Sequence, residues 1–182
     1  MSLKNSVILL SGKPSVGKTT VIQKVISLLD DDAGGFYSRE ICISEKRVGF
    51  EIVTLDGVVS RLATKTDKTV FLDEISYEGY KVNLDAINQT AVPSMLKAMA
   101  ENKIIVIDEI GPMEVVSEVF CETVLKILSY DNVKILGTVV ERPCKFPDIV
   151  KSHPKVDTLF VNLENRDTLP KRIYSLLMES GS

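Results

Sequence analysis

Long hydrophobic runs are missing from this sequence, and cysteine is scarce. The longest uninterrupted apolar stretches, Val7–Leu10 and Ile104–Ile107, have four residues each, whereas a membrane-spanning helix needs about 20. We therefore expect no membrane span, and because no secretory signal is recognisable, we expect a cytoplasmic protein. The three cysteines, Cys42, Cys121 and Cys144, are odd in number and far apart, so neither a disulfide framework nor a paired zinc knuckle is indicated.

An excess of basic residues is also absent. The chain has 22 Lys and Arg against 25 Asp and Glu, which gives a formal net charge of −3. Nucleic-acid carriers usually display a basic surface that displaces phosphate counterions, so we do not expect a nucleic-acid partner. The composition is 45% hydrophobic and 26% charged, without a biased tract, as in an ordinary globular protein. A length of 182 residues fits one domain, which we predict over residues 1–182; no protein partner can be read from the sequence.

Short apolar runs alternate with helical repeats along most of the chain. Val7–Leu10 has the pattern of a strand buried on both faces, and apolar residues then recur at helical spacing from Lys18 to Leu29. Strands alternating with helices imply a parallel sheet with helices on both faces, whose ligands gather at the carboxyl ends of the strands. The remaining predicted elements are a helix capped by Asp85 and bent or split by Pro93, a strand at Ile104–Ile107, a helix over Val116–Leu128, strands at Val133–Val140 and Asp157–Leu163, and a helix over Leu169–Leu177.

The segment after the first predicted helix has a different pattern. Phe36–Leu55 alternates apolar and polar residues around a polar turn at Ser44–Arg47, which predicts an antiparallel hairpin. Asp56–Tyr80 is polar, with isolated apolar residues, and its pattern predicts no defined structure; an excursion over the ligand site is one interpretation. The predicted fold class is therefore α/β, with a mostly parallel sheet and an antiparallel hairpin insertion.

A glycine-rich loop follows the first predicted strand. Gly12–Thr19 matches G-x-x-x-x-G-K-[ST] in full, between a strand and a helix, which is the context that a phosphate-binding loop requires. Glycines let backbone N–H groups turn inward around phosphate oxygens, and the start of the helix adds the positive end of its dipole. We expect Lys18 to contact the β- and γ-phosphates and the Thr19 hydroxyl to ligate Mg²⁺. A glycine-rich turn without a ligand is the alternative. The residues predicted to contact the nucleotide here are Gly12, Lys13, Pro14, Ser15, Val16, Gly17, Lys18, Thr19 and Thr20.

Two carboxylates follow the second buried strand. Asp108 and Glu109 come directly after Ile104–Ile107, and so lie at the sheet edge where the glycine loop also opens. Asp108 is predicted to face the magnesium ion, usually through a water molecule. Glu109 is predicted to orient or deprotonate the water that attacks the γ-phosphate. An Asp-Glu pair after a strand is often only a solvated turn. The presence of the phosphate-binding loop favours a functional role for this pair.

A phosphoryl transition state spreads charge over the γ-oxygens, so a cation beyond the loop lysine is expected. The candidates are Arg39, Arg142 and Arg166. Arg142 is the best placed, because it follows the third buried strand at the ligand edge; an ordinary surface role is the alternative. Thr138, near the same edge, is a candidate γ-phosphate sensor or a structural strand residue. The only histidine, His153, has no partner at motif spacing, and we predict no catalytic role for it.

Together these motifs resemble the small P-loop nucleoside-triphosphatases of thermophilic bacteria and archaea, a family that includes the animal cancer-related nucleoside-triphosphatase. The similarity spans nearly the whole chain, and the run D-E-I-G-P-M-E is its most distinctive part. The resemblance rests on Gly12–Thr20, Gly34–Glu40, Val48–Phe50, Thr54–Gly57, Ile107–Glu114 and Glu164–Arg166.

That resemblance implies a RecA-like P-loop fold, a three-layer sandwich, and slow Mg²⁺-dependent hydrolysis of ATP, GTP and other nucleoside triphosphates with little preference for base. It also implies that Gly111–Glu114 lies beside the nucleotide, so Gly111 joins the predicted binding residues. Two positions depart from the family pattern. Ser15 replaces a glycine, where we expect binding to survive, and Glu141 stands where a more basic residue is expected, beside the catalytic candidate Arg142.

Three interpretations of the function stay open at this point. A phosphohydrolase that uses water as the acceptor is favoured by Glu109 directly after Asp108. A P-loop kinase for a small molecule would require an arginine-rich lid, and Asp56–Tyr80 contains only Arg61. A nucleotide-dependent adaptor would use the hairpin and Asp56–Tyr80 as segments that change order with the γ-phosphate.

Overall fold

The computed structural model describes residues 6–65 and 70–179. Residues 66–69 of the segment Asp56–Tyr80, for which the sequence predicted no defined structure, lie outside the described residues. The elements in chain order are β1 (Val7–Ser11), α1 (Lys18–Leu29), the 3-10 turn η1 (Asp30–Asp32), β2 (Ala33–Ile43), β3 (Lys46–Thr54), β4 (Val59–Thr64), β5 (Glu74–Tyr77), β6 (Tyr80–Asn83), α2 (Leu84–Ala86), the π turn η2 (Ile87–Ala91), α3 (Val92–Ala100), β7 (Ile104–Ile110), the 3-10 turn η3 (Glu114–Val116), α4 (Glu118–Ser129), β8 (Ile135–Val139), α5 (Lys145–Lys151), β9 (Val156–Phe160) and α6 (Leu169–Glu179).

The described strands form one nine-stranded sheet in the order β5-β6-β4-β3-β2-β7-β8-β1-β9. Pairing is parallel from β2 through β7, β8 and β1 to β9, and antiparallel from β2 outward through β3, β4, β6 and β5. The predicted α/β fold with a parallel sheet and an antiparallel hairpin is confirmed, but the sheet is evenly mixed, with four parallel and four antiparallel strand pairings in the described residues. The antiparallel part is larger than expected, because Asp56–Tyr80 supplies β4 and β5.

The pattern of β4 explains why the sequence did not reveal it. Three successive residues, Leu62, Ala63 and Thr64, are all buried, so the strand lacks the alternation of a half-buried strand. The register between β3 and β4 pairs Phe50 with Ala63 but Glu51 with Arg61, which leaves Leu62 as an extra residue in a bulge. A bulge of this kind turns consecutive side chains inward, so the strand lacks the alternating apolar and polar residues from which strands are predicted.

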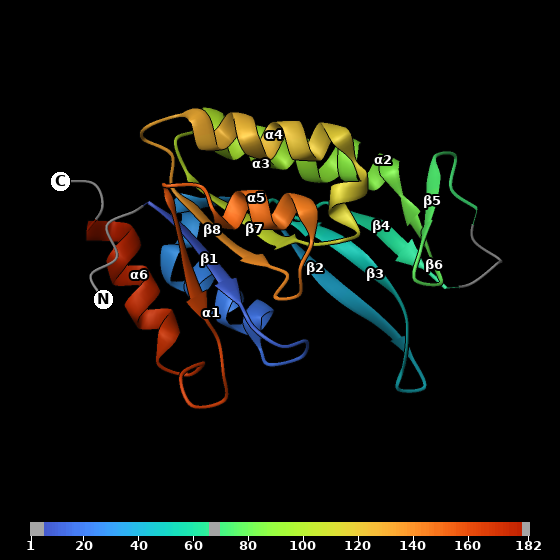
Figure 1. The fold of residues 1–182 in the computed structure, drawn as a ribbon, viewed down its shortest axis with the longest axis horizontal. Helices are drawn as coiled ribbons and strands as arrows, with labels where there is room; N and C mark the ends of the chain where they lie inside the picture. The colour runs from blue at the N-terminus through green and yellow to red at the C-terminus, as the bar shows by residue number, and fades with distance from the viewer. Residues whose placement is uncertain (1–5, 66–69, 180–182) are drawn as a thin grey trace.

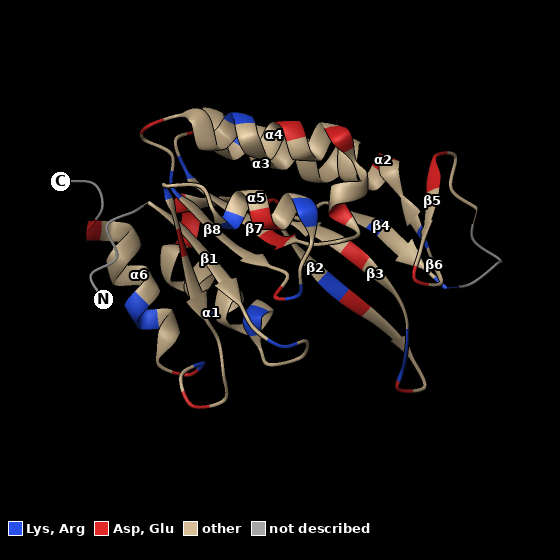
Figure 2. Ribbon diagram, in the orientation of Figure 1, with Lys and Arg blue, Asp and Glu red and all other residues tan. Residues whose placement is uncertain are grey.

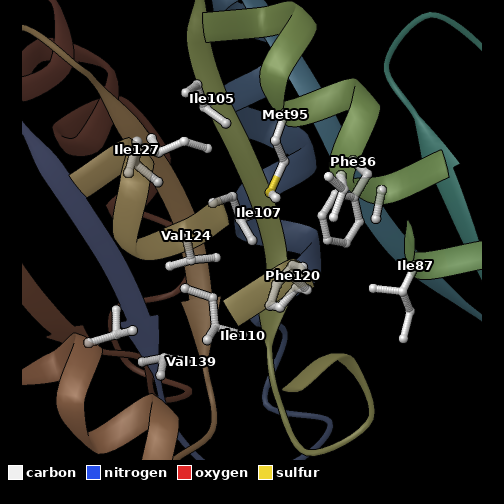
Figure 3. Packing of buried hydrophobic residues seen from close by; sticks show 14 of the residues in the cluster. Phe36, Ile87, Met95, Ile105, Ile107, Ile110, Phe120, Val124, Ile127 and Val139 are labelled. Atoms are coloured by element: carbon white, nitrogen blue, oxygen red, sulfur yellow. The ribbon is translucent and has the colours of Figure 1, made fainter. Parts of the chain in front are cut away.

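Helices cover both faces of the sheet (Figure 1), which confirms the predicted three layers. On one face α3 and α4 pack over the strands, and Figure 3 shows Met95 and Phe120 pointing toward Phe36, Ile105 and Ile107. On the other face α1 and α6 pack against β1, β7 and β8. None of the helices in the described part of the chain has both the length and the apolar character of a membrane span.

Several element ends differ from the prediction. The helix predicted to be capped by Asp85 instead begins at Leu84, where the Asn83 side chain accepts the Asp85 N–H. Pro93 lies in the first turn of α3, and the chain passes from α2 to α3 through the π-helical segment η2 without leaving the helical conformation, so the helix is distorted before Pro93 but not split in two. α5 was not predicted, since it is only seven residues long and contains Pro147. The three cysteines are free, as expected.

Replacing Phe120 with alanine is expected to lower the free energy of unfolding by about 3–5 kcal/mol. The ring is 0% exposed and packs edge-on against Phe36, with ring centroids 6.3 Å apart, so its removal leaves a cavity. Denaturant unfolding measures the loss. Leu125→Ala, on the same helix but 43% exposed, is the control and is expected to cost about 1 kcal/mol or less. Equal losses in the two variants would contradict this description of the core.

Candidate functional site

A cavity of about 760 Å³ opens at the carboxyl edge of the parallel strands. It is lined by the loop after β1, by Glu109 of β7, by Arg142 after β8 and by the turn between β5 and β6. The volume lies within the range of about 300–1,000 Å³ typical of small-molecule sites. The expectation that the glycine loop and the carboxylate pair open on the same edge is thus confirmed.

Most of the predicted contact residues reach this cavity. Its second wall comes from the antiparallel strands, which contribute aromatic and charged side chains including Arg39, Phe50 and Tyr80. Of the predicted binding residues, Gly12, Pro14, Ser15, Gly17, Lys18, Thr19, Thr20 and Glu109 line the cavity, whereas Lys13, Val16, Asp108 and Gly111 lie outside the lining.

The shape of the loop depends on residues without room for a side chain. A Cβ at Gly12 would lie 2.6 Å from the carbonyl oxygen of Val161, so only glycine fits there. Gly17 has φ of 106° and precedes α1, whose first turn has no side-chain cap, so the N–H groups at the helix start are available to an anion. Ser15 adopts φ of 60°, and it keeps this glycine-like conformation at a cost on the order of 1 kcal/mol.

Lys18 folds back over the loop that precedes it. Its ammonium donates to the carbonyl oxygen of Gly12 at 2.9 Å and to that of Lys13 at 3.3 Å. Basic and acidic residues are interspersed over the elements in Figure 2, so no broad basic face surrounds the site in this view. The positive charge at the phosphate loop is therefore local.

Asp108 is buried directly behind the loop, with 1% of its surface exposed. One carboxylate oxygen, Oδ1, accepts a hydrogen bond from the Thr138 hydroxyl. The other, Oδ2, is buried and accepts no hydrogen bond from the described residues. Burial raises the pKa of Asp108, and the hydroxyls of Thr138 and Thr19 and the ammonium of Lys18 oppose that rise. Thr138 is thus a structural partner of Asp108, one of the two roles considered for it.

Glu109 faces the cavity on the other side of the same strand. Burial raises its pKa, the charge of Asp108 adds to the rise, and the charges of Lys18 and Arg142 oppose it. A Cβ at Gly111 would lie 2.4 Å from Glu109 Oε1. Glycine at that position therefore makes room for the Glu109 carboxyl, which gives a physical reason for the glycine in D-E-I-G-P-M-E.

Glu114 is a third buried carboxyl in the site. Residue-level reasoning did not find it, and only the family resemblance placed it beside the nucleotide. It is 4% exposed, and burial, followed by the charge of Glu109, raises its pKa to about 8, although the N–H groups of Glu114 and Gly111 oppose the rise. At neutral pH this side chain is therefore largely protonated.

The three candidate arginines occupy different positions. Arg142 lines the cavity, and its Nη2 donates to the Tyr77 hydroxyl at 2.5 Å and to Glu78 Oε1 at 2.9 Å. Arg39 also lines the cavity but pairs with Glu51 at 2.7 Å. Arg166 lies behind the loop. It donates to the Val16 carbonyl oxygen at 3.4 Å, and its stem packs beside Gly17.

The donor set near Asp108 fits a hard cation. Asp108 Oδ2 is a buried carboxylate oxygen without a partner, and the Thr19 hydroxyl, which lines the cavity, acts on the Asp108 pKa. Mg²⁺ takes oxygen ligands, uses few of them from the protein and keeps several waters. No group of three or more His, Cys, Asp or Glu side chains suited to a metal occurs in residues 6–65 and 70–179, so a site of the dedicated multi-ligand type is not present there.

Comparisons with known proteins agree with this geometry. The family model described as NTPase matches residues 7–174. The chain is 42% identical to the nucleoside-triphosphatase THEP1 of Thermotoga petrophila over 93% of this chain and 92% of that protein. It is 32% identical to the cancer-related nucleoside-triphosphatase homolog of Mus musculus, over 95% and 97% of the two chains.

Solved structures show the same fold. The crystal structure of THEP1 from Aquifex aeolicus superposes with a TM-score of 0.84 at 30% identity, covering 94% of this chain and 98% of that one. The solution structure of a human cancer-related nucleoside triphosphatase gives a TM-score of 0.80 at 30% identity, over 96% and 98% of the chains. The predicted P-loop fold and the family resemblance are thereby confirmed, and the chain belongs to the NTPase family of nucleoside-triphosphatases.

Proposed function

We propose that the protein is a Mg²⁺-dependent phosphohydrolase that converts ATP, GTP and other nucleoside triphosphates to the diphosphate and phosphate. The observation that carries the proposal is the single cavity shared by the phosphate loop and Glu109, with Asp108 directly behind the loop. The groups assigned to the ligand are the loop backbone, Lys18, Glu109 through the attacking water and Asp108 through Mg²⁺, and all of them act at the phosphates, which every nucleoside triphosphate shares. Little preference for base follows from that.

Binding is assigned to the loop and to the residues behind it. Backbone N–H groups of the loop and of the first turn of α1 hold the phosphate oxygens, and Lys18 exchanges the carbonyl oxygens of Gly12 and Lys13 for the β- and γ-phosphates. Thr19 and Asp108 would hold Mg²⁺. When bound, that ion neutralises charge on the β- and γ-phosphate oxygens.

The hydrolytic step is assigned to Glu109. Its carboxylate orients a water molecule and accepts a proton from it, while the water oxygen bonds to the γ-phosphorus and the bond from that phosphorus to the β–γ bridging oxygen breaks. Burial raises the pKa of Glu109, which makes the carboxylate a stronger base than an exposed glutamate. Glu114 remains largely protonated at neutral pH and so adds little negative charge beside the triphosphate.

The kinase and adaptor interpretations have less support. Arg61, the arginine of Asp56–Tyr80, does not line the cavity. Its Nη2 lies 3.9 Å from Oε1 of Glu51 on the neighbouring strand β3, so Arg61 does not form a lid over an acceptor. An adaptor with little turnover would use the same loop. Replacement of Glu109 distinguishes the hydrolase, kinase and adaptor interpretations.

Replacing Glu109 with glutamine is expected to lower phosphate release by about 10²–10⁴-fold, because the amide cannot accept the proton of the attacking water. Release from ATP and from GTP is measured with Mg²⁺ and without an added acceptor. The exposed Glu122→Gln variant on α4 is the control and should match the wild type. Undiminished release in Glu109→Gln would contradict the assignment. ADP formed by the wild type only with an acceptor, and without free phosphate, would identify a kinase, and tight binding without turnover an adaptor.

The raised pKa of Glu114 also predicts how stability depends on pH. The unfolded chain loses this proton near pH 4.5, whereas the folded protein retains it to about pH 8. The folded state therefore binds more protons between these values, and the free energy of unfolding falls as the pH rises through that window. One pKa unit corresponds to about 1.4 kcal/mol, so the decrease can reach a few kcal/mol.

Glu114→Gln keeps a neutral side chain at every pH and should flatten this dependence. Urea unfolding at pH 5 and pH 8 gives the comparison, with Glu122→Gln as the exposed control. Asp108 and Glu109 also have raised pKa values, so part of the slope will persist. If the free energy of unfolding changes equally with pH in Glu114→Gln and the wild type, Glu114 does not titrate as described.

A further inference from the structure

The end of β5 and the turn that joins it to β6 reach across the cavity to Arg142, which lies three residues after the end of β8. In the sheet order these strands are separated by β4, β3, β2 and β7, so the contact does not arise from neighbouring strands. Tyr77 ends β5 and Glu78 begins the turn, and Arg142 is their partner across the cavity. All three line the cavity together with Glu109 and Lys18.

The three side chains form a closed set of hydrogen bonds. Arg142 Nη2 donates to the Tyr77 hydroxyl at 2.5 Å and to Glu78 Oε1 at 2.9 Å, and the Tyr77 hydroxyl donates to the same carboxylate oxygen at 3.0 Å. Within the described residues, Nε and Nη1 of Arg142 have no hydrogen-bond partner. Nη2 thus holds the guanidinium, and the N–H groups of Nε and Nη1 are available as separate charged donors to phosphate oxygens.

Stability does not account for this arrangement. The side chains of Arg142 and Glu78 are 53% and 56% exposed, and an ion pair in such a setting contributes little to folding because water screens it. Its effect is on orientation. A free arginine side chain samples many rotamers, and holding it beforehand removes the entropy cost of ordering it when the γ-phosphate develops charge.

Arg142 is also close enough to the reacting region to act there. It lines the same cavity as Glu109, the carboxylate assigned to the attacking water, and its charge opposes the rise that burial causes in the pKa of Glu109. Lys18 lines the same cavity from the loop after β1. A guanidinium that follows β8 comes from a different element than the loop lysine, and would add a second cation for the γ-oxygens.

We propose that Tyr77 and Glu78 are positioning residues that hold Arg142 with its free nitrogens toward the γ-phosphate, where it stabilises the charge of the transition state. The inference rests on the proposed hydrolytic function. Because Tyr77 and Glu78 act through Arg142 on the transition state, their loss lowers kcat and leaves KM nearly unchanged.

The experiment compares kcat and KM for ATP hydrolysis in a set of variants. Arg142→Ala is expected to lower kcat by about 100-fold, as loss of a charge-stabilising donor does. Glu78→Ala is expected to lower it by about 10-fold through a misplaced guanidinium. Glu78→Gln and Tyr77→Phe should lower it less, since each keeps part of the hydrogen-bond set. Glu74→Ala, on β5 and outside the cavity, is the control and should match the wild type.

The double variant Glu78→Ala with Arg142→Ala tests whether the effect passes through the arginine. It should match Arg142→Ala alone, because Glu78 then has nothing to position. A further 10-fold loss in the double variant would overturn the proposal, as would an unchanged or increased kcat in Glu78→Ala. An increase would show that Glu78 restrains Arg142 instead of presenting it.

Glu109→Gln, measured in parallel, separates this inference from the proposed function. If Glu109→Gln loses release while Glu78→Ala does not, only the positioning role is wrong. If Glu109→Gln retains full release, the hydrolytic assignment itself is wrong. Thermal unfolding of each variant confirms that the comparison is made on folded protein.

Discussion

The parallel pairing of β1 with β8, and of β8 with β7, is the constraint on which the site depends. Leu10 pairs with Thr138, and the neighbouring Gly137 pairs with Ile107, so the three strands end in one row. The residues that follow are the phosphate loop on β1 and Asp108 on β7. Gly137 allows β7 and β8 to approach each other at this point, because a Cβ at position 137 would lie 2.5 Å from the Ile107 carbonyl oxygen.

Charge compensation follows from that geometry. The row brings Asp108, Glu109 and Glu114 together in a buried region, where burial raises the pKa of each. A triphosphate adds further negative charge, so binding requires cations on more than one side. Lys18 supplies one from the loop, Mg²⁺ is proposed as a second beside Asp108, and Arg142 is proposed as a third. Protonation of Glu114 limits the repulsion that remains.

The sequence revealed those parts of the fold and site that local chemistry determines. The loop could be predicted because Gly12, Gly17 and Lys18 are required within eight residues of one another, and β1 and β7 could be predicted because buried parallel strands have short, wholly apolar runs. The strand β4 could not, since a bulge at Leu62 removes its alternation.

Contacts between distant segments were also beyond the sequence. Tyr77 and Glu78 lie in a segment without a clear pattern, and their partner Arg142 is 65 and 64 residues away in the chain. Glu114 carries no signal of its own, because its raised pKa comes from burial against Glu109, which only the fold produces. The catalytic and metal-binding roles assigned from sequence remain predictions, although the structure brings the residues to one place.

The central claim is that the loop binds the phosphates of a nucleoside triphosphate. Calorimetric titration of the protein with a non-hydrolysable triphosphate and Mg²⁺ tests it most directly, because it measures binding affinity without turnover. The wild type should bind, and Lys18→Ala should bind about 10–100-fold more weakly while remaining folded, as loss of a charge-assisted contact implies. Lys24→Ala, an exposed change on the same helix, should bind like the wild type. Equal affinity in Lys18→Ala and the wild type, or no heat with the wild type, would contradict the account.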